Sequence, residues 1–216
     1  MNEEAKARED MCRIAKSIFD RGLTCGASGN ISVRLGNGMT LVTPTGSCMG
    51  FLDPAQISLL DRDLTHLSGD KPTKEIPLHA AFYETRPDTG AVVHLHSSYS
   101  TALSMLPDVD TENVVPPLTP YTIMRVGKVP LLPFFLPGDT AMGNAVRALG
   151  GKYSAVMLAN HGPVVADKDL WAAFFAIEEL EETAKLSFLT KGMSPRHLSA
   201  EQIDALVKKF NIDWDG

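Results

Sequence analysis

The sequence predicts an α/β protein in three layers, with a central sheet between helices. Short apolar runs that are typical of buried strands alternate along the chain with segments whose apolar residues recur at helical spacing. The alternation shows no internal repeat. The 216 residues can build one sizeable core, and no stretch rich in Pro, Gly or Ser is long enough to be an interdomain linker. We therefore expect a single domain over residues 1–216.

Turn and helix-cap signals predict the helices and strands in the first half of the chain. Apolar residues recur at helical spacing before Gly22, which supplies a stop. Asn37-Gly38 between two strand-like runs is a hairpin signal. Asp53-Pro54 is typical of an N-cap followed by proline, so a short helix is expected there, and Pro77 starts another. The expected helices cover residues 11–19, 53–60 and 77–86, and the expected strands cover residues 31–35 and 39–43.

The second half follows the same alternation. The segment 116–137 is rich in proline and apolar residues and predicts strands joined by turns. Asp139 can cap a helix that Gly150-Gly151 ends, and a longer amphipathic helix begins near residue 170 and is closed by Gly192. Ser199 opens a capping box for a last helix. Further strands are expected at 91–96, 155–158 and 164–166, with a helix at 97–105.

Composition and charge exclude several classes of function. The hydrophobic fraction of 44% and charged fraction of 21% are those of a globular protein, and the net charge of −6 with scattered basic residues argues against nucleic-acid binding. The amino end carries both signs of charge, and no run of about 18 apolar residues occurs, so we expect neither a secretory signal nor a membrane span, and a cytoplasmic protein. Cys12, Cys25 and Cys48 form no C-x-x-C pair, which favours small buried thiols.

Three histidines are the strongest sign of chemistry. His94-Leu95-His96 follows the apolar run 91–93, and alternate residues of a strand share a face, so two imidazoles can meet one divalent ion. His161, in Ala159-Asn160-His161-Gly162-Pro163, can supply a third. Three neutral nitrogen donors leave one coordination position open, which is typical of a catalytic metal. An enzyme is therefore the leading hypothesis.

Several loops could bind an anion, although each alone is more typical of an ordinary turn. Gly29-Asn30, Thr45-Gly46 and Thr73-Lys74 offer backbone N–H groups, hydroxyls or an ammonium. Glu75 follows directly and could transfer a proton beside a metal or occupy its open position. It could equally be a glutamate favoured by a helix start. His66, His79 and His197 are expected to be ordinary surface or packing residues.

The order of these motifs resembles the class II sugar-phosphate aldolase and epimerase family, of the fuculose-phosphate aldolase type, over almost the full chain. That resemblance implies a three-layer fold whose central sheet is mixed and largely antiparallel, one Zn²⁺ per subunit, and a homotetramer with active sites at subunit interfaces. The family usually has serines where Thr73 and Lys74 stand; Lys74 keeps the attraction for an anion, but one hydroxyl contact is lost. The motifs that carry the resemblance are Gly29-Asn30, Thr45-Gly46, Thr73-Lys74-Glu75, His94-Leu95-His96 and His161-Gly162.

The resemblance also implies a role for each residue. His94, His96 and His161 would bind zinc. Glu75 would be a fourth ligand in the absence of substrate and the carboxylate that transfers protons, and Tyr121 would be a proton donor to the site of a neighbouring subunit. The phosphate of the substrate would be held by Gly29, Asn30, Thr45, Gly46, Thr73 and Lys74.

The reaction expected from this resemblance is decarboxylation of a phosphorylated sugar acid. Lys71–Glu75, Leu118–Tyr121 and Ala159–Pro163 are most similar to family members that convert a four-carbon 3-oxo sugar-acid phosphate into dihydroxyacetone phosphate and carbon dioxide through an enediolate. Arg125 could meet the carboxylate of the substrate or form a structural salt bridge. Aldol cleavage of a ketose 1-phosphate such as fuculose 1-phosphate is the main alternative. A thio-sugar phosphate dehydratase and a non-catalytic metal- or sugar-phosphate-binding module are more remote alternatives, and Glu75 disfavours epimerisation.

Overall fold

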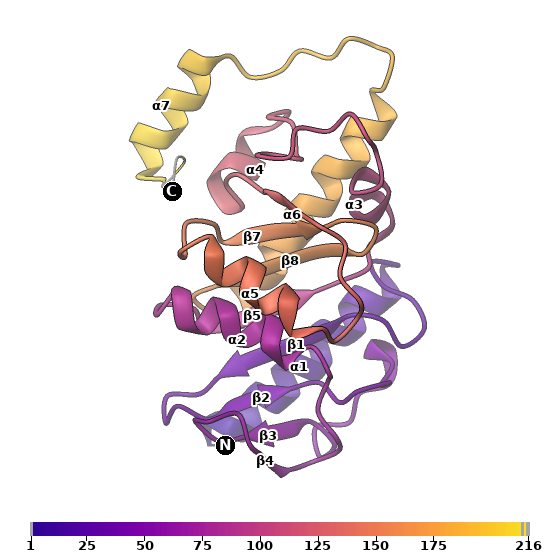
Figure 1. Ribbon diagram of the computed structural model, residues 1–216, viewed down its shortest axis with the longest axis vertical. Coiled ribbons are helices and arrows are strands. Elements are labelled where there is room, and N and C mark those ends of the chain that lie inside the picture. The colour runs from indigo at the N-terminus through magenta and orange to yellow at the C-terminus, as the bar shows by residue number, and fades with distance from the viewer. Residues whose placement is uncertain (1, 213, 215–216) are drawn as a thin grey trace.

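An eight-stranded sheet lies in the middle of the protein, whose computed structural model describes residues 2–212 and 214 (Figure 1). Its strand order is β4-β3-β2-β1-β5-β8-β7-β6. Neighbouring strands are antiparallel except β6 and β7, which are parallel, so the expectation of a mixed, largely antiparallel sheet is confirmed. The strands are β1 Asn30–Arg34, β2 Thr40–Val42, β3 Ser58–Leu60, β4 His66–Ser68, β5 Ala91–His94, β6 Leu131–Leu132, β7 Ala155–Leu158 and β8 Gly162–Asp167.

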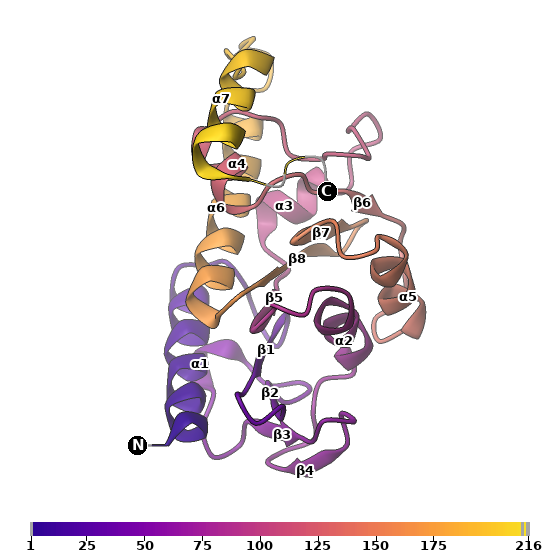
Figure 2. The same ribbon diagram turned by 90° about the vertical axis from the view of Figure 1, so that its left-hand side faces the viewer.

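Helices cover both faces of the sheet, as the three-layer prediction requires. Viewed along the sheet, α1 and α6 lie on one side and α2 and α5 on the other (Figure 2). The helices are α1 Glu3–Asp20, the 3-10 helix η1 Met49–Phe51, α2 Ile76–Thr85, α3 Ser98–Leu103, α4 Pro120–Arg125, α5 Thr140–Ala148, α6 Leu170–Leu189 and α7 Ala200–Phe210. Asp139 caps α5, and the predicted capping box at Ser199 opens α7. None of the described helices is long and apolar enough to cross a membrane.

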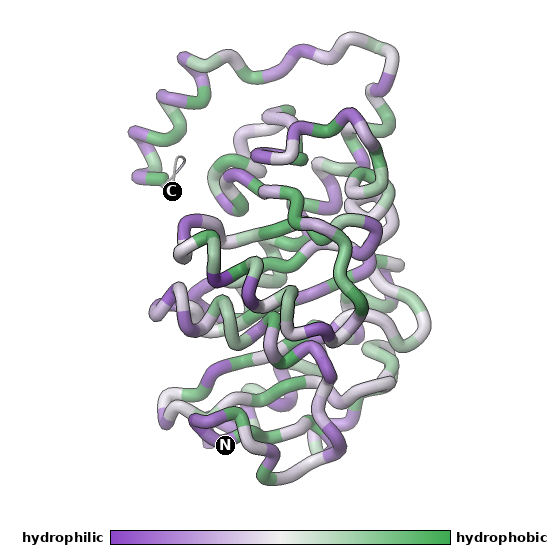
Figure 3. The backbone as a smooth tube through the Cα atoms, viewed as in Figure 1, coloured by the Kyte–Doolittle hydropathy of each residue, from purple (hydrophilic) through white to green (hydrophobic). Residues whose placement is uncertain are grey.

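Alternate residues of the central strands supply two separate cores. On β5, Val93 belongs to the core under α1 and α6, while Val92 packs in the core under α2 and α5. β8 divides in the same way, with Val165 in the first core and Val164 in the second. Figure 3 shows these strands as hydrophobic (green) segments in the middle of the molecule. Burial of each such side chain contributes about 1.5–3 kcal/mol, so β5 and β8 are anchored between the two helical layers.

The register of these strands brings three chain segments to one end of the sheet. Asn30, the first residue of β1, lies opposite His94, the last residue of β5, and His94 lies opposite Val164 of β8. The segment after β5, the segment before β1 and the turn before β8 therefore meet there.

The predicted helix at 53–60 is wrong. Asp53 accepts a hydrogen bond from the backbone N–H of Ala55, which forms a turn. Residues Ser58–Leu60 are then buried as β3 and pair with β2. Pairing and burial in the sheet outweigh the local helix-start signal. The exposed edge strand β4 was also not among the expected strands.

The segment 116–137 contains one short strand, β6, but the expectation of strands joined by turns is wrong for α4. The Thr119 hydroxyl accepts a hydrogen bond from the backbone N–H of Thr122, and Pro120 occupies the first helical turn, which is a favourable helix start. The expectation of buried thiols is also wrong for Cys25, which is exposed, while Cys12 and Cys48 are half-buried.

Candidate metal centre

Three imidazoles converge at the end of the sheet where β5 stops. The Nε2 atoms of His94 and His96 lie 3.2 Å apart, those of His94 and His161 lie 3.3 Å apart, and those of His96 and His161 lie 3.0 Å apart. The structure thus brings together the three histidines that the sequence singles out.

Each histidine is held by a different local feature. His94 is fully buried, and its Nδ1 donates to the carbonyl oxygen of Pro163 at 2.9 Å, which leaves the lone pair of Nε2 free. His96 lies two residues beyond the end of β5, and His161 precedes β8 in the turn from β7. A Cβ on Gly162 would lie 2.2 Å from the carbonyl oxygen of Leu95, so only glycine permits this turn to approach the chain between the first two histidines.

Glu181 of α6 fixes the chain immediately after His96. Its buried carboxylate accepts hydrogen bonds from the Ser97 hydroxyl at 2.7 Å, from the Ser100 N–H at 2.8 Å and from the Tyr99 N–H at 2.9 Å. A carboxylate at a helix start is favoured by the unpaired N–H groups of the first turn. The available sequence signal was that Glu181, four residues after Ile177, falls on the apolar face of α6.

The donor set fits a divalent metal. Burial lowers the pKa of His94 to about 3, and it also lowers the pKa of His96 and of His161, so the three imidazoles are neutral near pH 7. Three neutral nitrogens that face one another repel unless a cation lies between them. Tetrahedral coordination at the usual zinc–nitrogen distance separates nitrogen ligands by about 3.3 Å, close to the spacings found here.

Glu75 lies beside the three imidazoles. One carboxylate oxygen is 3.5 Å from the Nε2 of His94, and the other is 3.7 Å from the Nε2 of His161. Burial alone would raise the pKa of Glu75, but His94 and a hydrogen bond from the Asn30 amide lower it below its usual value. The residue ends the loop before α2, where its side chain makes no capping hydrogen bond. The carboxylate is therefore directed to the metal centre rather than to the helix.

The Gly29-Asn30 pair lies against the same histidines. A Cβ on Gly29, whose φ is +80°, would lie 2.8 Å from the carbonyl oxygen of His94, so glycine allows the close approach. The Asn30 side chain is buried and donates from Nδ2 to Glu75 at 2.7 Å. The amide expected to hold phosphate is thus engaged with the carboxylate.

The remaining anion-binding loops run side by side. Pro44 and Pro72 form an isolated antiparallel bridge, and the Thr45 N–H donates to the carbonyl oxygen of Lys71 at 2.9 Å. Thr73 is buried, while Thr45, Gly46 and Lys74 are exposed. The charge of Lys74 helps to lower the pKa of His161, which is consistent with an ammonium near the metal centre. The paired loops therefore offer their exposed groups next to Glu75.

Comparisons with known proteins identify the family. The sequence model of the class II aldolase and adducin N-terminal domain matches residues 9–188. This chain belongs to that family. The 3-oxo-tetronate 4-phosphate decarboxylase of Escherichia coli (strain K12) is 49% identical over 203 residues, a match that covers 94% of this chain and 96% of that protein.

Solved structures agree with this membership of the class II aldolase family. The crystal structure of YgbL from Escherichia coli, described as an aldolase/epimerase/decarboxylase, matches with a TM-score of 0.93 at 47% identity and covers 95% of this chain and 99% of that chain. An L-fuculose 1-phosphate aldolase matches with a TM-score of 0.83 at 27% identity over 96% and 97% of the two chains. Class II aldolases depend on a metal, and the three histidines of this member form a group that could hold one.

Two other sequence-predicted residues lie on α4. Tyr121 is 56% exposed, and Arg125 lies with its guanidinium 5.8 Å from the centre of the Phe175 ring. Thr122, which follows Tyr121, is buried against Thr183 of α6 through a short hydroxyl–hydroxyl hydrogen bond, so α4 presents Tyr121 from a fixed base.

His79 was expected to be a surface or packing residue, and it is a buried packing residue. It lies one helical turn after Glu75 on α2 and hydrogen-bonds to the side chains of Asn30 and Ser32. The spacing of four residues from Glu75 was the sequence signal for this position. His66 and His197 are exposed, as expected.

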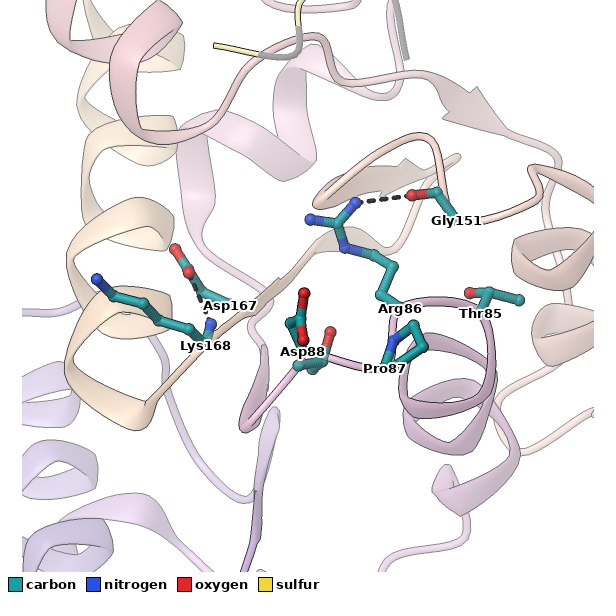
Figure 4. Close-up of a pocket in the computed structure, with 8 residues that line it drawn as sticks. Thr85, Arg86, Pro87, Asp88, Gly151, Asp167 and Lys168 are labelled. Atoms are coloured by element: carbon teal, nitrogen blue, oxygen red, sulfur yellow. Dashed lines mark hydrogen bonds between the residues drawn. The ribbon is translucent and has the colours of Figure 1, made fainter. Parts of the chain in front are cut away.

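A separate cavity of about 290 Å³ lies at the far end of the central strands (Figure 4). It opens where β5 begins and β8 ends, and Arg86 donates there to the carbonyl oxygen of Gly151 at 2.7 Å. Lys168 and Asp167 contribute opposite charges to its lining. Because none of the residues predicted to act in catalysis lines this cavity, the chemistry is assigned to the metal centre.

Proposed function

We propose that this protein is an enzyme that decarboxylates 3-oxo-tetronate 4-phosphate to dihydroxyacetone phosphate and carbon dioxide. The observation that carries the proposal is the convergence of three neutral imidazoles with the Glu75 carboxylate, in a chain 49% identical to a decarboxylase of that name. We propose further that residues 1–216 form one domain and that the enzyme is a cytoplasmic homotetramer.

His94, His96 and His161 would hold one Zn²⁺ through Nε2. The metal would supply Lewis acidity that stabilises the negative charge developing on the substrate's keto oxygen. The bond from His94 to the Pro163 carbonyl keeps the coordinating nitrogen unprotonated, and Glu181 restrains the chain that carries His96.

The reaction needs one bond to break and one proton to be placed. The bond between the carboxylate carbon and C2 breaks, its electron pair moves into the C2–C3 bond and onto the C3 oxygen, and carbon dioxide leaves without a proton. A proton must then be delivered to C2 to give dihydroxyacetone phosphate. Glu75, with one oxygen 3.5 Å from the Nε2 of His94, is the buried carboxylate that can hold and pass that proton.

The substrate phosphate would be bound by the paired loops. Lys74 supplies positive charge, and Thr45, Gly46 and Thr73 supply hydroxyl and backbone donors. Gly29 and Asn30 would border the same space, with the Asn30 amide held on Glu75. Phosphate recognition is thereby separated from proton transfer, which we assign to Glu75.

Tyr121 would serve the site of a neighbouring subunit. Its exposure on α4 leaves the phenol available to a second copy of the chain, and a tyrosine there could protonate C2. Arg125, one helical turn later, is proposed to attract the substrate carboxylate.

Aldol cleavage of fuculose 1-phosphate is the second candidate, because the L-fuculose 1-phosphate aldolase structure shares the fold over almost its whole length. The same carbon–carbon cleavage would then release an aldehyde instead of carbon dioxide. Incubation of the zinc-loaded protein with each substrate separates the two. A higher kcat/KM for 3-oxo-tetronate 4-phosphate, with release of carbon dioxide, supports decarboxylation; faster release of aldehyde from fuculose 1-phosphate overturns it.

A further inference from the structure

A line of buried side chains runs from Glu75 away from the three imidazoles. The Asn30 amide donates to Glu75 at 2.7 Å, and its oxygen is hydrogen-bonded to the Nε2 of His79. The Nδ1 of His79 lies 2.7 Å from the Ser32 hydroxyl, which lies 2.8 Å from the Tyr83 hydroxyl. Asn30, Ser32 and His79 are each at most 6% exposed. The line connects β1 and α2 beneath the metal centre.

The carboxylate fixes the direction of every hydrogen bond in this line. An ionised carboxylate only accepts, so the Asn30 NH₂ faces Glu75 and the Asn30 oxygen faces His79. The Nε2 of His79 must then donate. Burial lowers the pKa of His79 to about 4, so the ring is neutral near pH 7 and Nδ1 accepts from Ser32.

The opposite direction would harm the site. An imidazole protonated at Nδ1 would accept at Nε2, and the Asn30 amide would then turn its NH₂ toward His79. Its oxygen would face the Glu75 carboxylate, where two acceptors repel each other. Glu75 would lose the only side-chain hydrogen bond that holds it in the described part of the chain.

We propose that His79, as the Nε2–H tautomer whose Nδ1 accepts from Ser32, is a positioning residue that orients the Asn30 amide and thereby holds Glu75 in place for proton transfer. This inference rests on the role proposed above for Glu75. Tyr83 ends the line and donates to Ser32; removal of its hydroxyl leaves the Ser32–His79 bond available. Supporting side chains of this kind typically alter activity or metal affinity by about 10- to 100-fold when they are lost.

The tautomer can be observed directly in the zinc-loaded protein. Long-range ¹H–¹⁵N correlation of ¹⁵N-histidine-labelled protein at pH 7.5 distinguishes the two neutral forms and the imidazolium. The signals of His79 are assigned by their absence in His79→Gln. We expect the Nε2–H tautomer; an Nδ1–H tautomer or an imidazolium overturns the inference.

A matched pair of variants then tests the link to Glu75. The amide of His79→Gln places an N–H near the position of Nε2 and can still donate to Asn30, whereas the shorter His79→Asn reaches toward Ser32 only. With activity expressed per mole of bound zinc, we expect His79→Asn to lower kcat about 10- to 100-fold with KM changed less than about threefold. His79→Gln should keep kcat within about threefold of the wild type. Equal losses in both variants would overturn the inference.

Ser58→Ala provides the control for loss of a buried hydroxyl in the same sheet. Ser58 on β3 is fully buried and donates to the carbonyl oxygen of Asp70 at 2.6 Å, away from Glu75. We expect Ser32→Ala to lower kcat about tenfold, in the range typical of lost supporting contacts, and Ser58→Ala to leave it unchanged. An equal fall in kcat in Ser32→Ala and Ser58→Ala would overturn the inference.

Failure of the proposed function can be told apart from failure of this inference. If the wild type does not convert 3-oxo-tetronate 4-phosphate, the proposed function fails, while the tautomer measurement still decides the orientation of Asn30.

Discussion

Replacement of Glu75 by glutamine removes the proton-transferring group while it preserves the shape of the side chain. The carboxylate is buried, lies 3.5 and 3.7 Å from two imidazole nitrogens and accepts a hydrogen bond from Asn30. The glutamine oxygen can still accept from Asn30, but the neutral amide cannot take up or return a proton near pH 7.

The expected loss follows from this geometry. A positioned acid or base contributes about 10²- to 10⁴-fold to a rate, so kcat should fall at least about 10²-fold, which corresponds to about 2.7 kcal/mol in the barrier. KM should change little, because Glu75 itself is not assigned to phosphate binding and the glutamine can still accept the hydrogen bond from Asn30. Zinc should be retained, because the three imidazoles supply the ligands.

The assay is release of carbon dioxide under saturating substrate, with zinc measured on the same sample. Glu84→Gln is the matched control on α2: Glu84 is exposed, pairs with Arg147 and lies away from the metal centre. We expect this control to keep full activity and to lose less than about 1 kcal/mol of stability, as is usual for an exposed pair. A zinc-loaded Glu75→Gln protein with wild-type kcat would refute the assignment of proton transfer to Glu75.

Four further outcomes are expected. His96→Ala should lower zinc content and activity together without unfolding the chain, as measured by metal analysis and circular dichroism; full zinc content would remove His96 from the site. Lys74→Ala should raise KM for the phosphorylated substrate more than it lowers kcat, and equal kinetics with an unphosphorylated analogue would discard the phosphate role. Tyr121→Phe should slow turnover with zinc retained, and mixing it with His96→Ala subunits should restore some activity; a fully active monomer would exclude shared sites. The pKa of His79 falls from 6.5 in the unfolded chain to about 4 in the fold, so the unfolded state binds more protons between these two pH values. The free energy of unfolding should therefore fall by about 3 kcal/mol as the pH drops from 6.5 to 4. Urea titrations should show a smaller loss in His79→Gln.

Periodicity and caps predicted most of the fold. The helix near residue 170, the Ser199 capping box and the strand at 155–158 depend on local signals, which the structure preserves. The helix predicted at 53–60 was wrong because β3 gains its stability from pairing with β2, a contact far away in the sequence. Local pattern cannot reveal such a partner.

The residues of the candidate site also fall into those that the sequence reveals and those that only the tertiary structure brings together. The motif His94-Leu95-His96 and the distant His161 have a chemistry that stands out in the sequence, and their nitrogens do meet. Ser32, Tyr83 and Glu181 are ordinary residue types. The register of β1 against β5, the packing of α2 on β1 and the packing of α6 on α3 bring them near the histidines. Supporting hydrogen bonds of this kind depend on tertiary structure and leave almost no sequence pattern.

The most direct test of the proposed function follows the carboxylate carbon of the substrate. 3-Oxo-tetronate 4-phosphate labelled with ¹³C in its carboxylate is incubated with the zinc-loaded protein, with the metal-depleted protein and with His96→Ala. The metal centre proposed here predicts that labelled carbon dioxide and unlabelled dihydroxyacetone phosphate form in equal amounts with the zinc-loaded protein, and that both are lost in the other two samples. Label retained in the sugar phosphate, or equal release by the metal-depleted protein, would contradict metal-dependent decarboxylation at these histidines.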